Sequence, residues 1–510
     1  MNMNKLIGFL CVLPLVIFIL TLGSFLRVYE LDKTGMEVDE STNLAVSMSI
    51  YNNPSIMRIY MEQTRMEVSN NHATNVYMMI YDVGYPSTKA EYDGTQHIYL
   101  YHPLVYFALM AGWFKLVGPG ILAARELNVV VSIIALLLVF MIMLRRGKGT
   151  ALLALLFITF DAWIIITNRM NYIENMQLVL ILIGIWLFGR ALRFSSSGPL
   201  PYVYAGIAIA LAIIFKHIGV FLIIAIVANW LISRKNTRGH IITLLTIAVS
   251  VAVYVGIMFL IYGPNYITQQ VWQFNRLLGV TGSRGMNFSV GTMIKVILDR
   301  YWIFVTTVLA IVVGWPLVIW DYLKSLVKNN VNEEDGLIIS WALAGCVFAV
   351  CSQLKGPHYL ILWLVPTYIF MAGKIVNWFK GRSLPWISVI AVTFVVINLL
   401  TWNYRVQVQQ GDTLRESANY ISTNLPQDSV VVTEQFLGTL IDQQYLRIDQ
   451  ATTEKLMKAD YLAIYASSTQ TIDDLPAIIQ GWFYYCRPVL AVFKGFKDDV
   501  VICKINHDFK

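Results

Sequence analysis

The sequence predicts an α-helical polytopic membrane protein of about eleven transmembrane helices, with interfacial helices and a small C-terminal α/β domain. Of the 510 residues, 57% are hydrophobic and only 14% are charged. The mean hydropathy is +0.60. The charged residues gather in loops between apolar segments. A water-facing surface could not cover this much hydrophobic side chain, so the net charge of +7 reflects membrane topology and no nucleic-acid partner is expected.

The predicted membrane spans alternate with basic loops. The first span follows Lys5, ends near Leu26 and has no obvious cleavage site after it, so it is expected to stay uncleaved with its N-terminus inside. Further apolar segments lie at 121–144, 150–167, 175–192, 202–215, 218–232, 240–262, 298–320, 337–353, 358–373 and 384–403. Every second connection is basic, with Arg145, Arg146 and Lys148; Arg190 and Arg193; Arg234, Lys235 and Arg238; Lys324 and Lys328; and Lys374, Lys380 and Arg382. The positive-inside rule assigns these five loops to the cytoplasm and the C-terminus to the outside.

Two domains are expected, a membrane domain at 1–403 and a soluble domain at 404–510. A long outer region at 27–120 belongs to the first domain. The alternation of basic loops holds only if the stretch 101–118 does not cross, and its aromatic residues and Lys115 suit a helix lying in the membrane interface. The stretch 41–50 is weakly amphipathic and is expected to form a second interfacial helix.

The soluble domain has the pattern of a small α/β layer structure. Thr413 and Glu416 form a capping box that opens a helix to about Asn424. Short β-rich runs follow at 429–433, 460–465, 489–493 and 500–505. No glycine-rich phosphate loop is present, so no nucleotide site is expected there. The five cysteines have no metal-ligand spacing, and Cys486 and Cys503 could pair if this domain lies outside.

Ionisable and hydrogen-bonding residues collect at the outer ends of the predicted spans. They are Asp39 and Glu40; His102; Arg125 and Glu126; Arg169 and Glu174; Lys216 and His217; and Lys355, His358 and Tyr359. Intramembrane charges are costly, so this one-sided gathering points to function. Structural alternatives remain open for each of them: solvated carboxylates, a rim pair at Arg125–Glu126, a bridge from Arg169 to Glu174, or interfacial belt residues. Lys216 has no acidic neighbour in sequence and needs either a partner within the fold or a bound anion such as a lipid phosphate.

These motifs, in their order and spacing, resemble the GT-C glycosyltransferases of the protein O-mannosyltransferase and aminoarabinose-transferase type, in glycosyltransferase family 39. The resemblance covers about residues 5–403. It is carried by Val38-Asp39-Glu40-Ser41, His102-Pro103, Arg125, Asn168-Arg169 with Glu174, Phe215-Lys216-His217-Ile218-Gly219, and Lys355-Gly356-Pro357-His358-Tyr359 ahead of Pro366. Such enzymes take a sugar from a polyprenyl phosphate on the outer face of a membrane.

The resemblance implies a role for each matching residue. Asp39 is expected to be the general base, with Glu40 as its neighbour or a metal ligand. Glu174 matches the family's second acidic position and is expected to be catalytic as well. Lys216, Arg169, Lys355 and Tyr359 are expected to meet the donor phosphate. His102, Arg125, His217 and His358 are expected to contact the acceptor or to support the structure. The expected partners are a polyprenyl-phosphate sugar and a glycan, lipid or protein acceptor, with inversion at the sugar.

Three questions stay open on the sequence. A divalent metal could be held by Asp39, Glu40 and Glu174 through oxygen ligands, or the reaction could proceed without one. A transporter or flippase of polyprenyl-linked glycans would also place charges along a substrate path, although the charges are one-sided and no internal repeat is visible. A scaffold that presents the C-terminal domain is a third reading, but it leaves Lys216 and the paired carboxylates unexplained.

Overall fold

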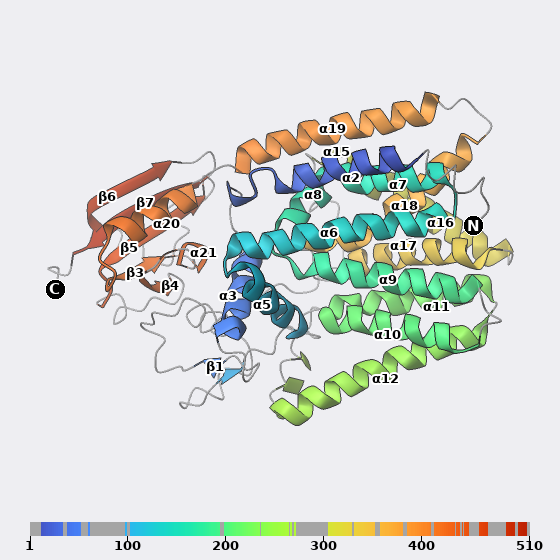
Figure 1. Ribbon diagram of the computed structural model, residues 1–510, viewed down its shortest axis with the longest axis horizontal. Coiled ribbons are helices and arrows are strands. Elements are labelled where there is room, and N and C mark those ends of the chain that lie inside the picture. The colour runs from blue at the N-terminus through green and yellow to red at the C-terminus, as the bar shows by residue number, and fades with distance from the viewer. Residues whose placement is uncertain are drawn as a thin grey trace. The chain divides into compact units, whose positions relative to one another are not determined.

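The computed structural model is mainly helical, with one mixed sheet near the C-terminus (Figure 1). It describes residues 12–33, 38–52, 60–61, 97–98, 103–193, 198–234, 236–264, 266–267, 270–271, 304–328, 331–351, 357–380, 385–409, 413–433, 435–438, 441, 443–447, 458–467, 486–494 and 498–506. The chain forms two compact units. Unit 1 comprises residues 1–29 and 125–403, and unit 2 comprises 30–124 and 404–510.

Unit 1 is a bundle of apolar helices. Their bounds are α2 Leu13–Val28, α6 Ile121–Leu144 (whose first turn belongs to unit 2), α7 Lys148–Phe160, α8 Ala162–Arg169, α9 Ile173–Arg193, α10 Leu200–Phe215, η4 His217–Val220, α11 Phe221–Ser233, α12 Thr237–Tyr262, α15 Val305–Leu309, η5 Ala310–Gly314, α16 Trp315–Lys328, α17 Glu333–Cys351, η6 Pro357–Tyr359, α18 Leu360–Trp378 and α19 Pro385–Gln409. The neighbours α9 and α10 run side by side, as do α11 and α17 (Figure 1).

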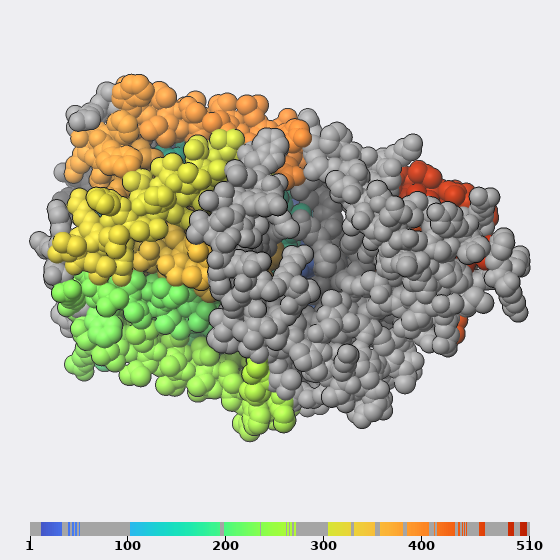
Figure 2. Space-filling view, turned by 180° about the vertical axis from the view of Figure 1, so that it is seen from behind, coloured from blue at the N-terminus to red at the C-terminus, as the bar shows by residue number. Residues whose placement is uncertain are grey.

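Seven of the described helices are long and apolar enough to cross a membrane, or eight if α7 and α8 form one broken span. The helices α2, α5 (Val105–Val117), α10 and α11 are apolar but shorter. The protein is therefore an integral membrane protein, while the count of eleven spans stays a prediction. Helices α12, α16 and α19 lie on one face (green, yellow and orange in Figure 2). Each of them exposes apolar side chains, including Leu245 and Val249, Trp320 and Leu323, and Val392 and Leu400. An exposed apolar surface of this extent suits contact with lipid.

The predicted single span 150–167 is wrong in one respect, because the chain breaks at Asp161. Helices α7 and α8 meet there at 60°. The Asp161 side chain accepts a hydrogen bond from Ile164 N at 2.9 Å and so caps α8. It also accepts from Tyr368 Oη at 2.6 Å and from Thr307 Oγ1 at 3.0 Å. A buried carboxylate needs such partners, and these tie the break to α15 and α18.

Unit 2 contains the sheet and a group of helices. The helices are η1 Leu31–Lys33, α3 Val38–Asn52, α5 Val105–Val117, α20 Thr413–Asn424 and α21 Gln435–Gly438. Helix α3 packs against α5 and touches α21. A short antiparallel pair joins β1 Tyr60–Met61 to β2 His97–Ile98. The predicted helices at 41–50 and 101–118 thus correspond to α3 and α5, while their place in the membrane interface stays a prediction.

The five-stranded sheet has the order β4-β3-β5-β7-β6. Its strands are β3 Val430–Thr433, β4 Gln444–Arg447, β5 Tyr461–Ser467, β6 Cys486–Lys494 and β7 Asp498–Ile505. Strand β3 is parallel to β4 and β5, whereas β7 is antiparallel to β5 and β6. Helix α20 covers an apolar core that includes Ile421, Val431, Leu437 and Ile502. The predicted helix has the observed bounds, and the four predicted strands correspond to β3, β5, β6 and β7.

Two further features concern residues 404–510. Strand β4 was not predicted, because its sequence QYLR carries polar residues that a strand pattern does not favour. In the compact units, residues 404–510 group with 30–124, and the chain changes unit between Asn403 and Tyr404. Cys503 is disulfide-bonded. The Cys486 side chain lies outside the described part of the structure.

Candidate active site

A buried ion pair lies at the start of α9 in unit 1. Lys216 Nζ donates to Glu174 Oε1 at 2.5 Å. Glu174 is 1% exposed and Lys216 is 6% exposed. Burying two charges carries a desolvation penalty, which their mutual attraction offsets only when they are well paired. A bundle does not need such a pair for stability, so its presence points to another role. It gives Lys216 the partner within the fold that the sequence analysis required.

The backbone around Lys216 is held by Gln177. Helix α10 ends at Phe215, and Lys216 adopts an extended conformation with φ −157° and ψ 129°. Gln177 Nε2 donates to Ala212 O at 2.9 Å and to Lys216 O at 2.7 Å, which satisfies carbonyls that the helix end leaves open. Gln177 and Glu174 are three residues apart and share a face of α9. One helix therefore holds both the backbone and the ammonium of Lys216.

Gly219 allows this turn to close. A Cβ atom at Gly219 would meet Ala212 O at 2.8 Å and Gln177 Nε2 at 3.0 Å. The first of these is a backbone atom, so the contact could be relieved only by moving the chain. The glycine is therefore needed for the close approach of η4 to the end of α10.

The 3-10 turn η6 supplies the aromatic side of the site. Lys216 Nζ lies 4.9 Å from the centre of the Tyr359 ring, within the range of a cation–π contact. His358 Nε2 lies 3.7 Å from Glu174 Oε1, and the His358 ring contacts the rings of Tyr359 and Tyr172. Tyr172, His358 and Tyr359 are all buried. Glu174, Lys216, His358 and Tyr359, predicted from separate motifs, thus lie together.

Asparagines fix the turn between α8 and α9 beneath this site. Asn175 Nδ2 donates to Asn128 Oδ1 at 3.1 Å and to Thr167 O at 3.0 Å. Asn168 Nδ2 donates to Asn175 Oδ1 at 2.8 Å, and Asn128 Nδ2 donates to Asn171 Oδ1 at 3.3 Å. Buried amides linked in this way rigidify a turn, so Glu174 is presented from a fixed base.

Arg169 and Arg27 join the same turn to α2. Arg169 Nη1 donates to the carbonyls of Leu26, Arg27 and Tyr29, at 3.1, 3.4 and 2.5 Å. A cation at this position satisfies the open carbonyls of α2 and complements its dipole. Arg27 Nε donates to Asn168 Oδ1 at 3.0 Å. The suggested bridge from Arg169 to Glu174 is wrong, because among described residues Glu174 contacts Lys216 and His358.

Asp39 and Glu40 belong to unit 2, in the first turn of α3. Asp39 is exposed, whereas Glu40 is fully buried. Both carboxylates lie at a helix N-terminus, where negative charge is favoured. The two neighbouring carboxylates therefore differ in their exposure.

The remaining predicted residues lie apart or outside the described chain. Arg125 is buried and Glu126 is exposed at the start of α6, so a simple rim pair between them is not favoured. His217 is half-buried at the start of η4. His102 and Lys355 lie outside the described residues. The sequence analysis missed Gln177, Tyr172 and Gly219; the three-residue spacing of Glu174 and Gln177 was the available signal for the first of them.

A metal finds no sufficient ligand set in the described part of the chain. No group of three or more His, Cys, Asp or Glu residues there could hold an ion. At Glu174 the nearest polar group is the Lys216 ammonium, which competes with a metal for the same oxygen. No step below is therefore derived through a metal.

Comparisons with known proteins agree on one class. Residues 101–262 match the family model described as dolichyl-phosphate-mannose-protein mannosyltransferase. The crystal structure of ArnT from Cupriavidus metallidurans bound to undecaprenyl phosphate is similar with a TM-score of 0.63 and 12% identity, covering 96% of this chain and 98% of that chain. A comparison with curated protein sequences gives no match.

A second solved structure has a more distant likeness. The Archaeoglobus fulgidus oligosaccharyltransferase in the apo form has a TM-score of 0.54 and 10% identity, covering 89% of this chain and 69% of that chain. The chain therefore has the fold of the GT-C membrane glycosyltransferases, as its motifs suggested. The region 101–262 that matches the family model includes Glu174 and Lys216, and that family is of the same class of glycosyltransferases.

Proposed function

We propose that the protein transfers a sugar from a polyprenyl-phosphate donor to a glycan, lipid or protein acceptor on the extracytoplasmic face of the plasma membrane. The observation that carries this proposal is the buried Glu174–Lys216 pair with Tyr359, held in a GT-C fold. The similar ArnT structure has undecaprenyl phosphate bound, which supports a lipid phosphate as the partner of such a fold. The comparisons give the transporter reading no support.

The proposed donor contact follows from the chemistry of Lys216. An ammonium has three donors, and Glu174 accepts one of them. A phosphate oxygen is an acceptor of the same kind, and the Tyr359 ring lies beside the same cation. Glu174 holds the Lys216 side chain in place before the donor arrives. Arg169 and Lys355 are the further cations proposed for the donor, and Arg169 also holds the end of α2.

The proposed reaction is a single displacement. The acceptor's hydroxyl or amine attacks the anomeric carbon, and the bond from that carbon to the phosphate oxygen breaks. The electron pair leaves with the lipid phosphate, whose developing charge Lys216 stabilises. The proton of the nucleophile goes to Asp39, the proposed general base, with Glu40 ordering the helix start. Attack from the side opposite the leaving phosphate inverts the sugar configuration.

A transfer assay tests the proposed function. Purified protein is mixed with a radiolabelled polyprenyl-phosphate sugar and an extract that supplies glycan, lipid and protein acceptors. The expected result is label in an acceptor fraction and free polyprenyl phosphate in equal amount. Transport without any cleavage of the sugar–phosphate bond, measured in vesicles with the same donor, would contradict the proposal.

A further inference from the structure

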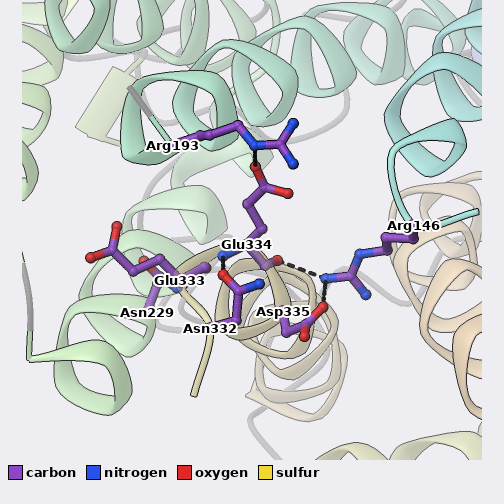
Figure 3. Close-up of polar contacts among 7 residues, drawn as sticks. All are labelled: Arg146, Arg193, Asn229, Asn332, Glu333, Glu334 and Asp335. Carbon is purple, nitrogen blue, oxygen red and sulfur yellow. Dashed lines mark hydrogen bonds and ion pairs between the residues drawn. The ribbon is translucent and has the colours of Figure 1, made fainter. Parts of the chain in front are cut away.

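A second charged cluster lies at the other end of α9 from Glu174. Arg146 Nη2 pairs with Asp335 Oδ1 at 2.5 Å and donates to Glu334 O at 2.8 Å. Arg193 Nε pairs with Glu334 Oε1 at 3.2 Å. Figure 3 shows both arginines reaching the first turn of α17 from two sides. These contacts neutralise two arginines and fasten the ends of three helices together.

Two further arginines in this cluster are not neutralised in this way. The guanidinium carbons of Arg145 and Arg190 lie 5.8 and 5.7 Å from the centre of the Trp186 ring. In the described chain neither arginine has a hydrogen bond or an ion pair with a carboxylate; Glu334 acts on Arg145 only through longer-range attraction. Four guanidinium groups thus lie near two paired carboxylates, and the other two positive charges both lie against one indole ring.

The local electrostatics favour an added anion. Burial lowers the pKa of Arg145, and the positive charges of Arg193 and Arg190 lower it further, against the attraction of Glu334. An anion between Arg145 and Arg190 would relieve this repulsion. Guanidinium groups bind phosphate well, because their planar donors match its oxygens.

A hollow beside the arginines has an apolar wall. Arg145, Arg146 and Trp186 line it together with the apolar Ile142, Ile185 and Leu337, between α6, α9 and α17. Glu334 also lines it, and its carboxylate is paired with Arg193. A free phosphate would use only the arginines. A phospholipid would use both parts, with its phosphate at the arginines and the start of an acyl chain against the isoleucines and the leucine.

We propose that Arg145, Trp186 and Arg190 form a binding site for the phosphate of an anionic phospholipid. The site lies about sixteen residues along α9 from Glu174, or roughly 24 Å at 1.5 Å per residue. The basic loops here are the ones predicted to be cytoplasmic, so the lipid belongs to the leaflet opposite the proposed reaction. Basic pockets between transmembrane helices on that side suit anionic head groups.

The test compares lipids and a free anion on the purified full-length protein. Native mass spectrometry and thermal melting in detergent are recorded with phosphatidylglycerol, phosphatidylcholine or inorganic phosphate. The wild-type protein is expected to retain phosphatidylglycerol preferentially. The variant Arg145→Gln/Arg190→Gln is expected to lose about 30-fold in affinity for phosphatidylglycerol, since each basic residue near an anionic lipid contributes about 5-fold.

A matched control removes two charges elsewhere. Arg238→Gln/Lys324→Gln changes two exposed cations of the same predicted cytoplasmic side and should keep the preference for phosphatidylglycerol. If the double site variant does not fold, Arg190→Gln alone, at an exposed residue, should lose about 5-fold. Equal retention of the two lipids by the wild type, or unchanged retention by the site variants, would overturn the proposal. Stabilisation by inorganic phosphate equal to that by phosphatidylglycerol would overturn the lipid assignment.

Discussion

Glu174 and Lys216 are the residues on which the proposed chemistry depends. Each is buried, and each would be costly to leave alone in the bundle. The lysine was identified from sequence by its lack of an acidic neighbour, but its partner was found 42 residues away and only by the fold. The pair therefore contributes to the structure as well as to the proposed donor site.

Lys216→Met is predicted to reduce both stability and sugar transfer. Methionine keeps the length of the stem but leaves the Glu174 carboxylate buried without its ammonium, which should cost about 3–5 kcal/mol. Thermal melting and the transfer assay measure the two effects. The double variant Glu174→Gln/Lys216→Met should recover much of the stability and none of the transfer. Recovery of transfer in that variant would remove the proposed role of Lys216.

Asp39→Asn is predicted to reduce transfer by about 100-fold or more, because an amide cannot accept the nucleophile's proton. Donor binding should stay unchanged. Glu40→Gln is the matched comparison, and its main effect should be on stability, because Glu40 is fully buried while Asp39 is exposed. Steady-state transfer and equilibrium binding of the labelled donor separate these effects. Transfer at the wild-type rate by Asp39→Asn would show that Asp39 is not the general base.

Sequence reasoning at the residue scale found the charged members of the site and missed the groups that position them. Ionisable and polar residues are costly beside a membrane span, so they are rare there and were easy to identify from the sequence. This applies to Glu174, Lys216, His358 and Tyr359. Gln177 and Tyr172 carry no charge, and only the three-residue spacing of Gln177 from Glu174 on α9 was a signal for either of them. Arg169 was predicted as a site residue, but its hydrogen bonds to the carbonyls at the end of α2 could not be predicted, because that segment lies 140 residues earlier in the chain.

The junction of α10, η4 and α11 is the element that aims Lys216. The sequence showed two short apolar segments flanking the lysine, and the structure has α10 and α11 at those places. The break at Asp161 could not be predicted in the same way, because one aspartate in an apolar run does not by itself indicate that the helix ends there. Its partners Thr307 and Tyr368 lie in distant helices.

Gly219→Ala is predicted to destabilise the junction by about 1–3 kcal/mol and to lower transfer, because the new Cβ meets the Ala212 carbonyl oxygen. Gly256→Ala is the control, since a Cβ there meets nothing within 4 Å in helix α12. That variant should be neutral or slightly more stable, because alanine favours helix. Thermal melting and transfer are measured for both. Equal behaviour of the two variants would contradict the tight junction.

The whole molecule combines a bundle of apolar helices with a mixed five-stranded sheet. Composition and basic loops were enough to predict a helical membrane protein, because lipid imposes long apolar segments. The grouping of residues 30–124 with 404–510 could not be predicted, since it depends on contacts between segments about 300 residues apart. The same holds for the assembly of the site from α9, η4 and η6.

The topology prediction is that the C-terminal domain lies on the extracytoplasmic face. A cysteine at the exposed position Asp428 should react with an impermeant thiol reagent added outside intact cells. A cysteine at Arg238, in a predicted cytoplasmic loop, should react only after the membrane is opened. Both are made in a chain in which the exposed Cys351 is replaced by alanine. Labelling of position 428 from the cytoplasmic side alone would show that the span count is wrong.

The most direct test of the central claim is a structure of the protein with undecaprenyl phosphate bound. The account predicts a phosphate oxygen within about 3 Å of Lys216 Nζ, on the side shared with Tyr359. Glu174 should remain within reach of the same ammonium. A lipid phosphate bound elsewhere, with the Glu174–Lys216 pair unchanged and no phosphate near it, would contradict the account.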